Sequence, residues 1–201
     1  EHCRRALMSR FSLESQVAVV IGGTGVLGGA MAKGLSAAGA AVAVVGRSAE
    51  RGEAVVDSII ARGGEAAFVA ADAGSRAQLS AARDTIVSRF SEPQILVNAA
   101  GGNNPNVTVG ADLHFQDIDL AAWHESFDLN LTAGVLLPCQ VFGPAMVAET
   151  HGSIINIASI TSHVPLSKVV AYSAAKAAVV SLTQFLAREW APSVRVNSIT
   201  P

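Results

Sequence analysis

The stretch Val17-Ala-Val-Val-Ile-Gly-Gly-Thr-Gly-Val-Leu-Gly-Gly29 decides the fold. It opens with an apolar, β-branched run typical of a buried strand, and an alanine-rich helical pattern follows its glycines. Glycines at such a turn let the backbone approach a phosphate, and the start of the helix offers unpaired N–H groups. Glycine also serves ordinary turns, but this position between strand and helix favours a pyrophosphate site. The predicted phosphate-binding residues are Gly22, Gly23, Thr24, Gly25, Val26, Leu27 and Gly28.

The alternation of strand and helix continues to the end of the chain. Strand after helix after strand implies right-handed crossovers and a parallel sheet covered on both faces. The sequence therefore predicts a single α/β domain with a doubly wound parallel sheet. The expected strands cover residues 17–21, 41–45, 66–70, 95–98, 153–157 and 194–198. The expected helices cover residues 26–38, 48–63, 75–90, 120–149 and 170–190, and the fourth contains Pro138 and Pro144, which predict a bend or a break.

Composition excludes several classes of protein. A chain of 201 residues, half of them hydrophobic, supports one well-buried core, and a net charge of -2 gives no reason to expect nucleic acid or an anionic membrane as partner. Cys3 and Cys139 are predicted to be free thiols, and no histidine or cysteine cluster has the spacing of a metal site. Residues 1–10 read as an extension without the apolar core of a signal peptide, and no apolar run looks long enough and unbroken enough to span a bilayer. We expect a soluble, cytoplasmic protein.

Tyr172 and Lys176 stand four residues apart on the last expected helix, on the same face. A neighbouring ammonium ion favours the phenolate form of a phenol, which makes tyrosine usable as a general acid or base. The hydroxyl of Ser159, brought to the same place, could hold a carbonyl oxygen while the tyrosine exchanges its proton. Alone, such a pair is also typical of an ordinary helix surface, so the other motifs must decide.

The end of the second expected strand bears on cofactor choice. Dinucleotide-binding folds often place an acid here to bind the ribose, whereas this chain has Gly46 followed by Arg47 and Ser48. A guanidinium suits a 2′-phosphate, so NADP is favoured over NAD, although Arg47 also fits a solvated position near a helix start.

Two further strand ends carry candidate cofactor contacts. Asp72 follows the third strand, where it either accepts a hydrogen bond from an adenine amino group or caps the next helix. Asn98-Ala99-Ala-Gly101 ends the fourth strand at the same sheet edge, and its small residues would let a cofactor lie against the backbone. Alternatively, the amide of Asn98 ties neighbouring strands together.

From Phe11 to Pro201 these motifs, with Asn130 in Asp128-Leu-Asn-Leu131, resemble the short-chain dehydrogenase/reductase family in order and spacing. The resemblance implies a Rossmann fold and a catalytic tetrad of Asn130, Ser159, Tyr172 and Lys176. It also implies cofactor contacts by Tyr172, Lys176 and Pro201, and a homotetramer through the helices near 120–149 and 170–190. The family pattern has a glycine where this chain has Val26, and it continues past Pro201 to a last strand that this chain is expected to lack.

A narrower resemblance, carried by Gly101-Gly-Asn-Asn-Pro105 and Pro165-Leu-Ser-Lys168 among other segments, is to the D-mannonate oxidoreductase (fructuronate reductase) branch of the family. It implies a small carbonyl or alcohol substrate such as a keto- or hydroxy-hexonate. Lys168 is the candidate partner of its carboxylate, and Asn103 and Asn104 are candidates for its hydroxyls. Two alternatives stay open, a 3-oxoacyl carrier-protein reductase and a dinucleotide-sensing module without catalysis.

Overall fold

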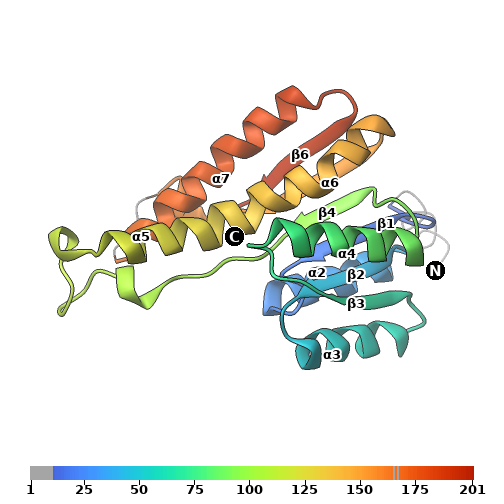
Figure 1. Ribbon diagram of the computed structural model, residues 1–201, viewed down its shortest axis with the longest axis horizontal. Helices are drawn as coiled ribbons and strands as arrows, with labels where there is room; N and C mark the ends of the chain where they lie inside the picture. Colours follow the sequence, from blue (N-terminus) through green and yellow to red (C-terminus); the bar gives the residue numbers. More distant parts are fainter. Residues whose placement is uncertain (1–10, 165, 167) are drawn as a thin grey trace.

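The predicted doubly wound parallel sheet is confirmed by a computed structural model, which describes residues 11–164, 166 and 168–201 (Figure 1). Six parallel strands lie in the order β3-β2-β1-β4-β5-β6. The register sets Val20 of the central strand opposite Val44 on one side and Val97 on the other. The strands are β1 (Val17–Ile21), β2 (Ala41–Gly46), β3 (Ala66–Ala70), β4 (Ile95–Asn98), β5 (Gly152–Ile157) and β6 (Val194–Ile199).

Every helix expected from the sequence is present, with bounds that differ by a few residues. The helices are α2 (Val26–Ala37), α3 (Ala49–Ile60), α4 (Arg76–Arg89), α5 (Leu120–Phe127), α6 (Leu137–Ala148) and α7 (Val170–Glu189). The short turns of 3₁₀-helix are η1 (Pro105–Val107), η2 (Phe115–Asp117) and η4 (Ile160–Ser162).

Side chains point alternately to opposite faces along each strand, and this divides the buried core between the two faces of the sheet. Val17, Val19 and Ile21 of β1 are buried with residues of α4, α6 and α7, whereas Ala18 and Val20 are buried with residues of α2 and α3. Because all strands are parallel, their carboxyl ends meet at one edge of the sheet. This is the edge at which open parallel sheets bind ligands.

The long apolar stretch from residue 120 is one continuous helical rod. Its irregular turns are π-helical and lie before both of its prolines. Between α5 and α6 the chain forms a π-helical segment, η3 (Asp128–Leu136). Pro138 is the second residue of α6 and follows η3 without a gap in the helix, and Pro144 lies inside α6. A proline disturbs the turn before it, because it lacks an N–H and its ring meets the carbonyl of residue i−4. The π-helical turns directly before Pro138 therefore agree with the expected irregularity, although the sequence did not predict their π-helical form.

Two helical stretches, Leu120–Ala148 and Val170–Glu189, are apolar and long enough to cross a membrane when judged by length and hydropathy alone. This differs from the expectation that no such run exists. In the fold the two stretches lie side by side (Figure 1) and contribute Phe142, Met146 and Val179 to the core over the sheet. Only 39% and 33% of their most apolar windows are buried, so packing against the sheet accounts for part of their apolar character.

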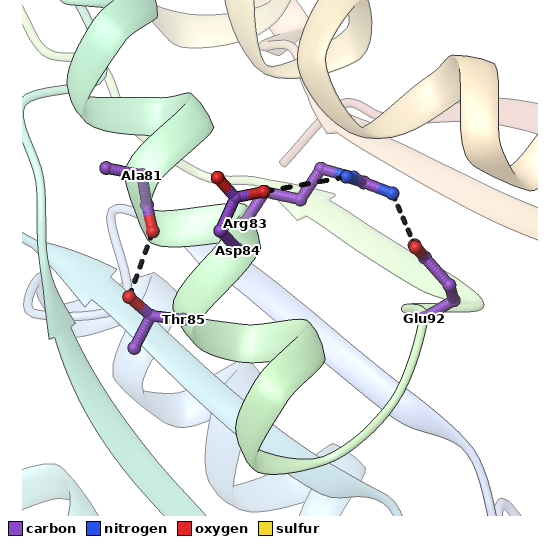
Figure 2. Close-up of polar contacts among 5 residues, drawn as sticks. All are labelled: Ala81, Arg83, Asp84, Thr85 and Glu92. Carbon is purple, nitrogen blue, oxygen red and sulfur yellow. Dashed lines mark hydrogen bonds and ion pairs between the residues drawn. The ribbon is translucent and has the colours of Figure 1, made fainter.

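The connection from α4 to β4 is held by a partly buried ion pair. Arg83 of α4 reaches Glu92 in the loop before β4, with 2.6 Å between Nη2 and Oε1, and its other nitrogen lies 3.9 Å from Asp84 (Figure 2). On the same helix the Thr85 hydroxyl donates to the carbonyl of Ala81. Such half-exposed pairs contribute little to stability, and this one joins α4 to the loop before β4.

Two glycines of α2 are expected to respond oppositely to alanine. A Cβ at Gly28 would lie 2.2 Å from the carbonyl oxygen of Gly22, whereas a Cβ at Gly34 meets nothing within 4 Å. Gly28→Ala should lower the free energy of unfolding by about 1–3 kcal/mol through backbone overlap. Gly34→Ala should raise it by up to about 1 kcal/mol through helix propensity. Urea unfolding of both variants checks the pair, and equal effects would contradict the close approach of the turn to α2.

Candidate active site

A cavity of about 220 Å³ opens at the carboxyl edge, between the ends of β1, β2 and β4. The structure brings many of the predicted cofactor residues together around it. Those that line it are Gly22, Thr24, Gly25, Arg47, Asp72, Ala99 and Gly101. Gly23 lies in the turn after β1, Gly28 is buried in the first turn of α2 where Val26 and Leu27 are exposed, and Pro201 is exposed two residues after β6.

The glycine turn brings two backbones into contact. Gly22 has a φ of +75°, in the left-handed region, and a Cβ there would lie 2.6 Å from the amide nitrogen of Ala100. Gly25 stands before α2 with no side chain to cap it. The N–H groups at the start of α2 are therefore left for an anion, which is the arrangement a pyrophosphate requires.

The end of the cavity beside β2 has no room for an acid on that strand. A Cβ at Gly46 would come within 2.6 Å of the side chain of Thr24, so Thr24 occupies the place of a carboxylate. Two guanidinium groups line the cavity instead, those of Arg47 and Arg51. Within the described residues every ion pair of a lysine or arginine with a carboxylate belongs to Arg83, so neither guanidinium has an acid partner.

Arg51 was missed in the sequence. Its signal was the spacing of four residues from Arg47, across Ser48, which caps α3 by accepting a hydrogen bond from the Arg51 N–H at 3.4 Å. With Ser48 as its cap, α3 begins at Ala49, so Arg51 lies in the first turn of α3, beside the cavity. Ser48 itself stands in the sequence between the two arginines that line the cavity.

Asp72 does not cap the following helix, because Ser75 does. Its carboxylate accepts a hydrogen bond from the Gly74 N–H at 2.9 Å, and its own N–H donates to the Gln78 side chain at 2.8 Å. One carboxylate oxygen is thus fixed within a turn while the residue lines the cavity. The capping role read from the sequence is therefore wrong for Asp72, and the adenine contact stays a prediction.

Asn130, in the π-helical segment η3, is fully buried and locked onto the loop after β4. Its side-chain oxygen accepts from the Gly102 N–H at 3.0 Å, and its amide donates to the carbonyls of Gly102 at 2.8 Å and Ser126 at 2.9 Å. A Cβ at Gly101 would lie 2.7 Å from the Asn130 oxygen and 3.1 Å from Lys176 Nζ. Glycine at 101 therefore lets Asn130 and Lys176 converge on the loop that borders the cavity.

Lys176 is only 4% exposed, and its ammonium donates to the carbonyl of Ile157 at 2.7 Å. Burial lowers the pKa of Lys176 to about 8, because a charged group loses hydration there. Its Nζ lies 5.7 Å from the centre of the half-buried Tyr172 ring. Ser159, at the end of β5, is buried and accepts from the Thr161 N–H at 3.3 Å. The pair on α7 and the serine after β5 thus come to the same edge as the glycine turn.

The candidate substrate residues lie on two loops that touch. The carbonyl of Lys168, an exposed residue with φ of +79°, accepts from the Val109 N–H at 2.8 Å. Asn103 donates to the Thr108 hydroxyl at 2.8 Å, and Asn104 accepts from the Asn106 N–H at 3.0 Å. Each asparagine thus has a partner within its loop, and the other half of each amide makes no hydrogen bond among the described residues.

Asn98 ties two strands together, as one interpretation of the sequence held. Its amide donates to Asn156 Oδ1 of the neighbouring strand at 2.8 Å and lies 3.4 Å from the Cys139 sulfur. Cys139 is a free, buried thiol whose pKa burial raises to about 12. Cys3 lies outside the described residues, and among those described no three histidine, cysteine or acidic side chains gather as a metal site would require.

Comparison with known proteins agrees with this geometry. The model of the short chain dehydrogenase family matches residues 16–201. The uncharacterized oxidoreductase UxuB of Bacillus subtilis is 39% identical over 199 residues, which cover 94% of this chain and 71% of the relative.

Two solved structures share the fold closely. A Haemophilus protein provisionally named a D-mannonate oxidoreductase, with bound NAD, matches with a TM-score of 0.91 and 33% identity over 97% of this chain and 73% of its own. A gluconate 5-dehydrogenase of Burkholderia cenocepacia, in complex with NADP and tartrate, matches with a TM-score of 0.86 and 30% identity over 97% of this chain and 74% of its own. The chain therefore belongs to the short chain dehydrogenase family, as an NAD(P)-dependent oxidoreductase that acts on CH–OH groups.

Proposed function

We propose that this oxidoreductase prefers NADP and interconverts the ketone and secondary alcohol of a sugar acid of the fructuronate/mannonate type. The observation that carries the proposal is the buried Lys176 ammonium beside Tyr172, at the edge where the glycine turn opens. The bound nicotinamide supplies or accepts the hydride. The side chains of this chain have to bind the dinucleotide, orient the substrate oxygen and move one proton.

Tyr172 gives its proton to the substrate oxygen during reduction and takes it back during oxidation. Lys176 holds the nicotinamide ribose and favours the phenolate form of Tyr172, while Ser159 orients the substrate oxygen by a hydrogen bond. Asn130 anchors a water that relays protons to Lys176. The convergence of Asn130 and Lys176 on Gly101 supports this last role, since the two groups approach the same glycine.

The preference for NADP rests on the adenosine end of the cavity. Arg47 and Arg51 offer two guanidinium groups without acid partners among the described residues, and Thr24 fills the place of a ribose-binding acid at Gly46. A 2′-phosphate satisfies both guanidinium groups through charge-assisted hydrogen bonds. We assign the adenine amino group to Asp72.

The proposed substrate class rests on the two touching loops. Lys168 offers a cation for a carboxylate, and the free halves of Asn103 and Asn104 offer donors and acceptors for hydroxyls. Two structural relatives are named for sugar acids, D-mannonate and gluconate. A carboxylated polyol needs this combination of one cation and several amides.

The enzyme is proposed to be a cytoplasmic homotetramer assembled through α7 and the rod formed by α5, η3 and α6. The large apolar side chain of Phe185 on α7 is 60% exposed and supports a contact there. Sedimentation as a monomer at micromolar concentration would refute the assembly, and recovery in a membrane or secreted fraction would refute the location.

The function is tested by oxidation rates of NADPH and NADH with fructuronate, tagaturonate, 5-ketogluconate and an acetoacetyl thioester. We expect a keto-hexonate to be reduced, with kcat/KM at least about 10-fold higher for NADPH, because a charge-assisted hydrogen bond is worth about 1.5–3 kcal/mol. Turnover of the thioester alone would instead indicate a carrier-protein reductase. Dinucleotide binding without turnover would indicate a sensing module.

Variants of the two arginines test the proposed cofactor preference. Arg47→Ala and Arg51→Ala should each raise the KM for NADPH about 10-fold or more and leave the KM for NADH nearly unchanged, because only NADPH carries the 2′-phosphate. An equal loss with both cofactors would show that these side chains serve the fold rather than the phosphate.

Burial of Lys176 has a consequence for stability as the pH changes. Between pH 8 and 10.5 the unfolded chain holds the lysine proton more tightly than the folded chain, so this group makes the free energy of unfolding rise with pH. Cys139 acts in the opposite direction above about pH 9, because its thiol loses a proton more readily in the unfolded chain. Lys176→Met should remove the lysine contribution and leave that of Cys139. Urea unfolding of both proteins across this window measures the difference, and parallel curves would refute the burial.

A further inference from the structure

A chain of buried polar side chains crosses the sheet beneath the active site. Asn98 of β4 donates to Asn156 of β5 at 2.8 Å, and Asn156 donates to the hydroxyl of Thr183 on α7 at 2.9 Å. The Thr183 hydroxyl in turn donates to the carbonyl of Val179 at 2.7 Å. Asn98, Asn156 and Thr183 are all at most 4% exposed. No step of the proposed reaction uses the Asn156 or Thr183 side chain.

The chain connects three elements that each carry part of the site. Asn98 and Asn156 are partners in the register of β4 and β5, and Asn98 is followed by the small residues that border the cavity. Asn156 immediately precedes Ile157, whose carbonyl receives the Lys176 ammonium. Thr183 follows Lys176 by seven residues, two helical turns, and therefore lies on the same face of α7.

Helix α7 is thus attached to the end of β5 at two points about 10 Å apart along its axis. One attachment is Lys176 to Ile157, and the other is Thr183 to Asn156. Apolar packing of Val179 and Leu186 holds α7 against the sheet, but such packing tolerates small shifts of the helix. Two directional attachments further restrict its tilt and its position along the strand, and these set where Tyr172 and Lys176 project.

Stability alone does not explain the polar chain. Apolar side chains of similar size at buried positions are often as stable as a hydrogen-bonded network, and they need no matched partners. Each hydrogen bond here has a direction, because the Thr183 proton is committed to Val179 and its oxygen accepts from Asn156. Asn98 Oδ1 has no partner among the described residues, which is a further cost to stability. What the network adds is one defined position of α7 relative to β5.

We propose that Asn156 and Thr183 are positioning residues for catalysis, which seat α7 so that Tyr172 and Lys176 meet the cofactor bordered by residues 99–101. The inference rests on the proposed roles of Tyr172 and Lys176. The Thr183 hydroxyl is the critical group, because among the described residues it is the α7 side chain that joins this hydrogen-bonded network. Losing it removes one of the two polar attachments of α7 to β5 without altering any group that touches the substrate.

Four forms of position 183 separate positioning from packing. Wild type and Thr183→Val differ in the hydroxyl at nearly equal volume, and Thr183→Ser and Thr183→Ala differ in the hydroxyl at a smaller volume. We expect kcat, measured with the carbonyl that the wild type reduces best, to be about 10-fold or more higher for the hydroxyl-bearing member of each pair. The KM for NADPH should change less than 3-fold, because the phosphate contacts lie on α2 and α3. The thermal unfolding midpoint depends on the volume of the side chain at position 183 as well as on its hydroxyl. Thr183→Ser should therefore be less stable than wild type yet nearly as active.

If kcat follows the unfolding midpoint across the four proteins, Thr183 is a packing residue and the inference is wrong. Should Thr183→Val fail to fold, the serine and alanine pair still decides. A second readout does not depend on turnover, namely the Lys176 contribution to the pH dependence of stability between pH 8 and 10.5, measured as the difference between each protein and the same protein carrying Lys176→Met. This difference should shrink in Thr183→Val and persist in Thr183→Ser. A wild type inactive on every carbonyl would refute the proposed function, whereas an undiminished lysine contribution in Thr183→Val would refute the positioning role alone.

Discussion

The site depends on one buried cation. Lys176 keeps its ammonium in the interior because the carbonyl of Ile157 accepts a hydrogen bond from it, and this holds α7 against the end of β5. A charge removed from water is expensive unless it is paired or hydrogen-bonded, so the lysine cannot shift far from that carbonyl. Tyr172, one turn earlier on α7, is then carried to the carboxyl edge of the sheet. The proposed catalytic pair is therefore positioned by a strand end rather than by a loop.

The two halves of the site meet through glycines. Gly22 brings the turn after β1 against the backbone at Ala100, and Gly101 leaves room for Asn130 and Lys176 on its other side. The segment 98–101, at and after the end of β4, thus touches the glycine turn at one point and Asn130 and Lys176 at another. Under the proposed function, a dinucleotide lying along this segment would have its adenosine end near Arg47 and Arg51 and its nicotinamide end near Lys176. The segment would then set the distance between the cofactor and the proposed catalytic groups.

The sequence predicted whatever depends on local pattern. Strands and helices follow from period and composition, and the spacing of Tyr172 and Lys176 places them on one helix face whatever lies around them. The π-helical segment escaped prediction, because the prolines gave a stronger signal than the contacts of Asn130 that accompany it. Arg51 and the link from Asn156 to Thr183 escaped too. Their meaning arises from residues brought together by the sheet, and a sequence read in order does not show those neighbours.

The central claim is that Tyr172 moves the proton while the other residues hold it in place. The most direct measurement is kcat for carbonyl reduction by Tyr172→Phe, together with its dissociation constant for NADPH. The account predicts a fall in kcat of about 100-fold or more, as for loss of a general acid, and a dissociation constant within about 3-fold of wild type, since binding rests on the glycine turn and the arginines. Turnover near the wild-type rate, with cofactor binding intact, would contradict it.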